Sequence, residues 1–261
     1  MTNSRVKIKP GTKRVIKLLL LAVFAAFILC AGSFSAVAEG ESAQIGEGLE
    51  NITGGADTLD IIFSLTFIAL IPSVLIMTTC FTRILIVLSI LRSALGLQQT
   101  PPNQVLIGIA LFLSLFIMGP VVSEIDAVAY TPYKNGVITS EEMLDKAVVP
   151  LRNFMLKQTK NEDINFFLSI SDQERPEDLD EISTFVVIPA FITSELRRAF
   201  LIGFLLYLPF LIIDMVVAST LMSMGMVMLP PTMISLPFKL MLFVLVDGWK
   251  LLFQTIVQSF N

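Results

Sequence analysis

Asp214 and Asp247 are carboxylates inside otherwise apolar stretches, where a pair of acids could do chemistry. Facing one another, they would suit an intramembrane aspartyl hydrolase, with one as general base and the other as general acid. Neither lies in a recognisable catalytic motif, however, and Lys250 follows Asp247 at the spacing of one helical turn. That spacing favours an ion pair, so we expect structural roles and no enzyme.

The composition excludes most other catalytic sites. The chain has no histidine, which rules out Ser-His-Asp and Cys-His catalysis and zinc sites with histidine ligands. Its two cysteines, Cys30 and Cys80, are too few for a disulfide-rich scaffold, and no phosphate-binding glycine loop is present. We expect no cofactor and no metal.

Several other ionisable residues lie in or beside the apolar stretches. Such groups usually face a bundle interior or a water-filled path, because exposure to lipid is costly. They are Arg83, Arg92, Glu195, Arg197, Arg198, Lys239 and Lys250. A secondary transporter normally shows internal repeats, and none is visible here. A chain of this size is more consistent with one wall of an oligomeric pore.

A methionine-rich run stands out between the last two apolar stretches. Met222, Met224, Met226 and Met228 alternate with other residues, and the run ends at Pro230 and Pro231. On a helix this spacing scatters the side chains, whereas an extended turn places them on one side. Glycine and paired prolines favour a non-helical turn. Composition alone also fits methionines buried in a membrane core, so both interpretations stay open.

The chain reads as a membrane protein. Its 261 residues are 54% hydrophobic and 15% charged, with a net charge of −4, whereas soluble domains carry about 25% charged residues. A soluble enzyme, a disordered protein and a basic nucleic-acid binder are therefore poor fits. Four segments of about 20 residues or more could be membrane helices: Ile61 to Thr82, Val105 to Val122, Val186 to Leu221 and Met233 to Val257. We expect the third to divide into a short helix ending near Arg198 and an apolar helix from Ala199.

The first 38 residues resemble a cleavable secretory signal. Six basic residues precede an apolar run that ends in small residues with Ala36-Val37-Ala38. A first membrane helix over Val15 to Ala38 is the alternative. Cleavage leaves 12 positive and 22 negative charges, a net of −10. Residues 39–60 then form a flexible, glycine-rich acidic arm.

An acidic insert lies between two apolar hairpins. We expect the first hairpin over 61–123, the insert over 124–185 and the second hairpin, with the methionine-rich loop, over 186–261. The insert carries six basic and 13 acidic residues. Thr139 to Glu142 has the pattern of a helix start with a capping box, so the insert should be helical. Arg83 and Arg92, with no nearby acid, favour a cytoplasmic loop, which places the insert in the periplasm.

Two groups of motifs carry a resemblance to a known family. The first comprises TRI at 82–84, RSALG at 92–96 and QTPPNQV at 99–105. The second comprises PAFITSEL at 189–196, GF at 203–204, PFLIID at 209–214, LPP at 229–231, LPFKL at 236–240 and VDGW at 246–249. From about Asp60 to its end, the chain resembles the FliP family, membrane proteins of the flagellar type III export gate. The family is related to the corresponding core subunit of virulence injectisomes.

The resemblance implies an all-α membrane protein that assembles into a helical pore. It implies a pentamer joined to FliQ-like and FliR-like subunits in the bacterial inner membrane, within the flagellar basal body. Other membrane proteins of the export apparatus and membrane lipid are further expected partners. Unfolded flagellar substrates would pass through this gate. Much of it would stand on the periplasmic side, which conflicts with a simple four-span topology.

The family's methionine gasket maps onto Met226, Val227 and Met228, with Met222 and Met224 flanking it. Many members have three consecutive methionines there, so Val227 is a departure. Outside catalysis, we expect assembly or coupling roles for Glu195, Asp214, Lys239 and Asp247. The alternative function is a homo-oligomeric ion channel or carrier subunit that acts without secretion machinery.

Overall fold

The computed structural model describes residues 66–261 apart from 67–68, 71, 172–181, 227 and 261. The predicted signal at 1–38, the arm at 39–60 and part of the first apolar segment (61–65, 67–68 and 71) lie outside the described residues. Leu75–Asn261 forms one compact unit, and the elements below belong to it.

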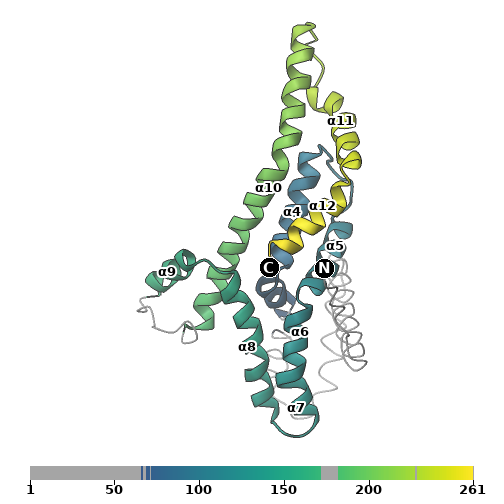
Figure 1. Ribbon diagram of the computed structural model, residues 1–261. Coiled ribbons are helices and arrows are strands. Elements are labelled where there is room, and N and C mark those ends of the chain that lie inside the picture. The colour runs from purple at the N-terminus through teal and green to yellow at the C-terminus, as the bar shows by residue number, and fades with distance from the viewer. Residues whose placement is uncertain (1–65, 67–68, 71, 172–181, 227, 261) are drawn as a thin grey trace, which may run out of the picture. The chain divides into compact units, whose positions relative to one another are not determined.

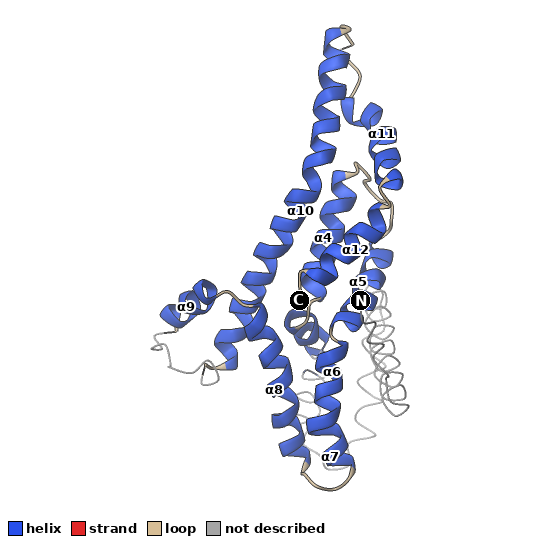
Figure 2. Cartoon of the chain, in the orientation of Figure 1, coloured by secondary structure: helices blue, strands red, loops and turns tan. Residues whose placement is uncertain are grey.

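Every regular element within the described ranges of this unit is helical (Figure 2). In chain order they are α4 (Phe81–Ala94), α5 (Asn103–Ile117), α6 (Gly119–Ile125), the π-helix η1 (Asp126–Tyr130), α7 (Thr131–Lys134), α8 (Ser140–Gln158), α9 (Asn161–Ile170), α10 (Thr184–Ser223), α11 (Pro231–Leu245) and α12 (Gly248–Gln258). The all-helical class is therefore confirmed for the described residues, whereas pore assembly and a periplasmic insert stay predictions.

The main core lies where α4 packs against α10 and α5 (Figure 1). Ile84, Leu88 and Leu91 of α4 are buried at the three- and four-residue spacing that places side chains on one helix face. Cys80, just before α4, is also buried, with its sulfur 3.3 Å from the Ser114 hydroxyl of α5. Cys80 is therefore a buried side chain that packs within the core.

A helical hairpin begins at Gly119, just before the predicted acidic insert, and continues into it. The α6–η1–α7 arm runs beside α8 (Figure 1). Thr139 begins α8 with the expected capping box: its hydroxyl accepts from the Glu142 N–H at 3.3 Å, and the Glu142 carboxylate accepts from the Thr139 N–H at 3.0 Å. These bonds satisfy backbone donors that a helix start leaves unpaired. The sequence prediction of this helix start is confirmed.

The predicted division of the third apolar segment is wrong. α10 is a single helix of 40 residues, Thr184–Ser223, and it continues through Arg198 and Ala199. We expected a break because charged residues interrupt the apolar run there. In the structure, Glu195, Arg197 and Arg198 bond to residues of other helices. The helix therefore does not have to end here for these charged side chains to be satisfied.

The fourth apolar segment is also not one helix. α11 ends at Leu245, and α12 leaves it at an angle of 66°. Asp247 adopts a left-handed conformation at φ 51°, which ends α11. Gly248 packs so closely that a Cβ would lie 2.3 Å from the Phe243 ring. The apolar pattern did not reveal this break, because residues on both sides of it are apolar.

Among the described helices, α10 alone has the length and apolar composition to cross a membrane. The number rises to as many as four if each of three bent helix pairs is counted as one span. The second predicted segment belongs to such a pair, since α5 and the Gly119–Lys134 arm are bent by 56°. Of the four predicted segments, Val186 to Leu221 lies within a single described helix, whereas each of the other three includes a bend between two helices.

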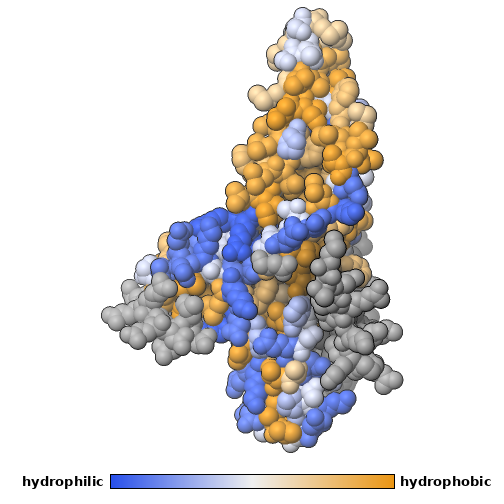
Figure 3. Space-filling model, in the orientation of Figure 1, coloured by the Kyte–Doolittle hydropathy of each residue, from blue (hydrophilic) through white to orange (hydrophobic). Residues whose placement is uncertain are grey.

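The α10–α11 hairpin presents a largely apolar surface, and polar residues gather nearer to α8 and α9 (Figure 3). Exposed apolar side chains on the hairpin include Phe200, Phe204, Ile212, Met215, Val216, Phe238, Met241, Val244 and Leu245. Soluble monomers rarely expose such a continuous apolar surface, which is typical of a face that contacts lipid or another protein.

Candidate functional site: a methionine loop and two ion pairs

The methionine loop, residues 222–230, joins α10 to α11. α10 ends in a Schellman motif: the Gly225 N–H donates to the Met222 carbonyl at 3.0 Å, and the Met226 N–H donates to the Leu221 carbonyl at 3.0 Å. Gly225 takes φ 75°, which L-residues with a side chain rarely adopt. The predicted non-helical turn is confirmed from Met224 onward, whereas Met222 still belongs to α10.

The described methionines of the loop do not pack inside the chain. Met222, Met224 and Met226 are exposed, and Met228 is 97% exposed. These side chains are therefore not part of the chain's own core, and their burial in a membrane stays a prediction. Val227, the middle residue of the predicted gasket, lies outside the described residues. The loop offers a flexible apolar surface to something beyond the chain.

An ion pair links α10 and α11, the two helices that the methionine loop joins. The Lys239 ammonium of α11 lies 2.6 Å from Asp214 Oδ2 of α10. It also donates to the Ala94 carbonyl at the end of α4, at 3.0 Å. The Ser235 hydroxyl donates to Asp214 Oδ1 at 2.5 Å. The Asp214 carboxylate is thus part of an ion-pair network that connects α10, α11 and α4.

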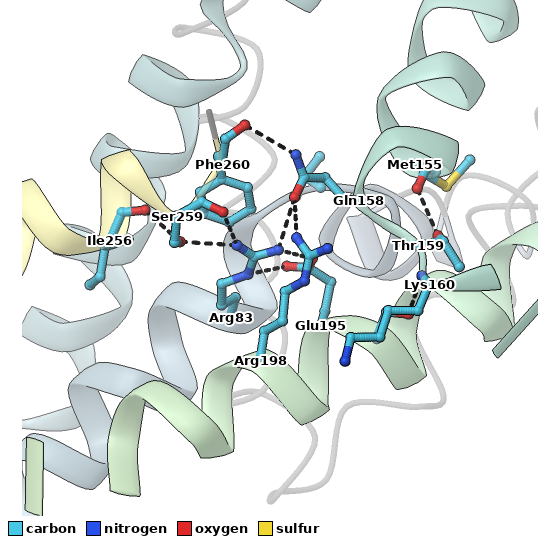
Figure 4. A network of polar contacts seen from close by, with 12 residues as sticks. Arg83, Met155, Gln158, Thr159, Lys160, Glu195, Arg198, Ile256, Ser259 and Phe260 are labelled. Carbon is cyan, nitrogen blue, oxygen red and sulfur yellow. Dashed lines mark hydrogen bonds and ion pairs between the residues drawn. The ribbon is translucent and has the colours of Figure 1, made fainter. Parts of the chain in front are cut away.

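A second ion pair is fully buried at the junction of α4 and α10 (Figure 4). Arg83 donates from Nε to Glu195 Oε2 at 2.9 Å and from Nη2 to Glu195 Oε1. Both side chains have an exposed fraction of 0%. Two parallel bonds between a guanidinium and a carboxylate give strong, directional recognition.

The rest of the Arg83 guanidinium is satisfied by α8 and by the chain's end (Figure 4). Nη1 donates to the Ser259 carbonyl at 2.9 Å, and Nη2 donates to Gln158 Oε1 at 3.2 Å. Its Cζ atom lies 3.6 Å from the centre of the Phe260 ring. Gln158 also accepts from Arg198 at 2.6 Å. The network joins α4, α8, α10 and the residues after α12.

Arg197 belongs to a more exposed cluster beside this network. Its Nη2 lies 2.8 Å from Asp163 Oδ1 of α9, and its Nη1 lies 3.3 Å from Glu162 Oε2. Asp163 also accepts from the buried Ser194 hydroxyl at 2.5 Å. This cluster fastens α9 to α10.

Asp247 stands apart from both ion pairs. In the part of the chain that the structure describes, no ion pair joins it to Lys250, so that predicted partnership is wrong. The helical spacing does not apply because Asp247 is left-handed and precedes α12. Its side chain is exposed among apolar neighbours.

The sequence identified the ionisable residues of both networks but not all their partners. Arg83 and Glu195 lie 112 positions apart, and Asp214 and Lys239 lie 25 apart. Opposite charges in apolar stretches were the available signal. Gln158, Ser235, Ser259 and Phe260 were missed, because a polar or aromatic residue near a helix end has no distinctive pattern.

Comparison with known proteins identifies the family of the chain. The FliP family model matches residues 64–256. A flagellar biosynthetic protein FliP of Bacillus subtilis is 52% identical over 211 residues, covering 81% of this chain and 94% of its own length. The FliP of Pectobacterium carotovorum is 49% identical, covering 82% of this chain and 81% of its own. The FliP of Caulobacter vibrioides is 43% identical over 95% of this chain and 92% of its own.

The match spans α4 to nearly the end of α12, so it includes the methionine loop and both ion pairs. The resemblance carried by the sequence motifs is thereby confirmed, and the chain belongs to the FliP family.

Proposed function

We propose that this chain is a pore-forming subunit of the flagellar type III protein export gate. Several copies, with FliQ-like and FliR-like partners, would conduct unfolded flagellar substrates across the bacterial inner membrane. Family membership and the relatives' role in flagellar biosynthesis support the setting. The observation that carries the pore is the methionine loop, which projects exposed apolar side chains from the turn between two apolar helices.

In the proposed gate, the residues 226–228 of each copy meet as an apolar constriction. Such a constriction can stop ions and water by dewetting. Methionine is flexible and polarisable, so its side chains can rearrange around an exported polypeptide of varying shape. Glu195, Asp214, Lys239 and Asp247 serve assembly or coupling in this proposal.

The test replaces both described methionines of the constriction. Met226→Ala with Met228→Ala should make cells leak ions severalfold faster while export largely survives, because shorter side chains leave the constriction open. Ion permeability and secreted flagellar protein are measured in the same strain. Met215→Ala with Met241→Ala is the matched control, since these methionines are also exposed but lie on the hairpin arms. Unchanged permeability in a fully assembled mutant gate contradicts the proposal.

A further inference from the structure

In the α10–α11 hairpin, which carries the methionine loop, prolines interrupt both helices close to the residues that join the two helices to each other. Pro209 lies inside α10 five positions before Asp214, and Pro237 lies inside α11 two positions before Lys239. A proline inside a helix removes one backbone hydrogen bond and lets the helix kink. Each arm therefore has an interrupted ladder beside the residues that join it to its neighbours.

The fastening consists of Asp214, Ser235 and Lys239, which we call the hairpin clamp. Lys239 and Ser235 are buried, and the Asp214 side chain is 20% exposed. The clamp is tied to α4 by the bond from Lys239 to the Ala94 carbonyl. That carbonyl belongs to the last turn of α4, where backbone acceptors lack helical partners and a positive charge is favourable.

Beyond the clamp, the two arms have similar length. Helical rise gives about 14 Å from Asp214 to Ser223 and about 12 Å from Pro231 to Lys239. Many side chains on these stretches, including Met215, Val216 and Met233, are exposed. Few contacts within the chain therefore hold the loop in place above the clamp.

We propose that the hairpin clamp sets the resting position of the methionine loop relative to α4, and that the arms bend at Pro209 and Pro237 when the loop is displaced. Asp214, Ser235 and Lys239 are thus positioning residues for the constriction. The inference rests on the proposed function for its purpose, but its geometry can be measured without transport.

An exchange of charges separates the clamp from a simple ion pair. Asp214→Lys with Lys239→Asp preserves opposite charges, but a carboxylate at 239 cannot donate to the Ala94 carbonyl. An ion pair needed only for assembly is restored by the exchange, whereas the tie to α4 is lost. Lys239→Arg is the matched control, because it keeps a cationic donor to both Asp214 and Ala94.

Distances are measured in the assembled gate with spin labels on Gln98→Cys and Met224→Cys, two exposed positions. The labelled chain is diluted into unlabelled chain so that each gate carries one pair. Loss of a charged hydrogen bond should raise the displaced population about tenfold, seen as a broader distance distribution. Lys239→Arg should keep the narrow one. An exchanged variant that assembles with an unchanged distribution overturns the clamp.

Two further variants keep the inference testable whatever the exchange does. If the exchanged gate does not assemble, Ser235→Ala removes one bond of the clamp while keeping both charges, and it should also broaden the distribution; an unchanged distribution overturns the clamp. Pro209→Ala with Pro237→Ala should narrow the distance distribution and slow export. A distance distribution and an export rate equal to those of the unmodified chain overturn the proposal that the arms bend at these prolines. Failure of the methionine test leaves these distances informative, so the two proposals can fail separately.

Discussion

At the scale of single residues, Arg83 is the most demanding group in the described structure. It is a guanidinium with no exposed side-chain surface, and Glu195, Gln158, Ser259 and Phe260 surround it. A buried ion pair does not guarantee net stability, because both charges leave water. Removing one partner, however, leaves the other charge buried without compensation.

Glu195→Gln or Arg83→Met should therefore destabilise the fold by about 3–5 kcal/mol, because each leaves one charge of the buried pair unmatched. The double change Arg83→Met with Glu195→Gln should cost clearly less than the two single costs added together. Glu162→Ala removes an exposed ion pair with Arg197 and should cost less than about 1 kcal/mol. Resistance of the purified chain to heat and protease measures all of these. Equal losses for Glu195→Gln and Glu162→Ala would show that burial of the pair is unimportant.

At the scale of elements, the end of α10 decides where the methionine loop begins. The Schellman motif turns the chain after Ser223, and Gly225 supplies the left-handed residue that this motif requires. The direction of the chain after this turn sets where the methionine side chains that follow it lie. The backbone conformation of one glycine therefore influences the positions of several side chains.

Gly225→Ala should strain the loop by about 1–2 kcal/mol, because a Cβ disfavours the left-handed conformation. We expect greater ion leak with an otherwise intact gate, measured as for the methionine variants. Gly108→Ala is the control: this glycine is helical, and an added Cβ would meet nothing within 4 Å. It should stabilise α5 by about 0.5–1 kcal/mol and leave permeability unchanged. Equal leak in both variants would reject a role for the turn.

At the scale of the whole molecule, the chain's apolar surface points to assembly. Leu75–Asn261 forms one compact unit, yet the α10–α11 hairpin and the neighbourhood of Asp247 leave large apolar side chains exposed. An exposed carboxylate without an ion-pair partner is costly beside lipid. A cationic group on another subunit would offset that cost.

Asp247→Ala should consequently reduce the yield of the proposed hetero-oligomer with two smaller apolar proteins. Asp247→Asn separates the causes, since asparagine tolerates the left-handed backbone but carries no charge. Loss in both variants identifies the charge, whereas loss in Ala alone identifies the backbone. Normal assembly and swimming in the Ala variant would remove Asp247 from the assembly residues. Recovery of a conducting homo-oligomer without partners would favour the alternative channel function.

Local signals predicted several parts of the fold. The capping box at Thr139, the helical class and the turn around Gly225 all depend on residues close together in the chain, so their patterns are visible in the sequence. Helix breaks inside apolar stretches were harder to predict. α10 continues through Arg198 because residues distant in the chain pair with its charged side chains. α11, in contrast, ends at Leu245 although the residues on both sides of that point are apolar.

The family, the apolar character and the residues with unusual chemistry could all be recognised in the sequence, because these are properties of residue type and motif. The pairing of the charges became visible in the folded chain. The fold placed Arg83 against Glu195, Lys239 against Asp214 and the Ala94 carbonyl, and it left Asp247 without an ion pair among the described residues. The physical reason is that an ion pair depends on distance in space, and separations of 25 to 112 positions along the chain do not specify that distance.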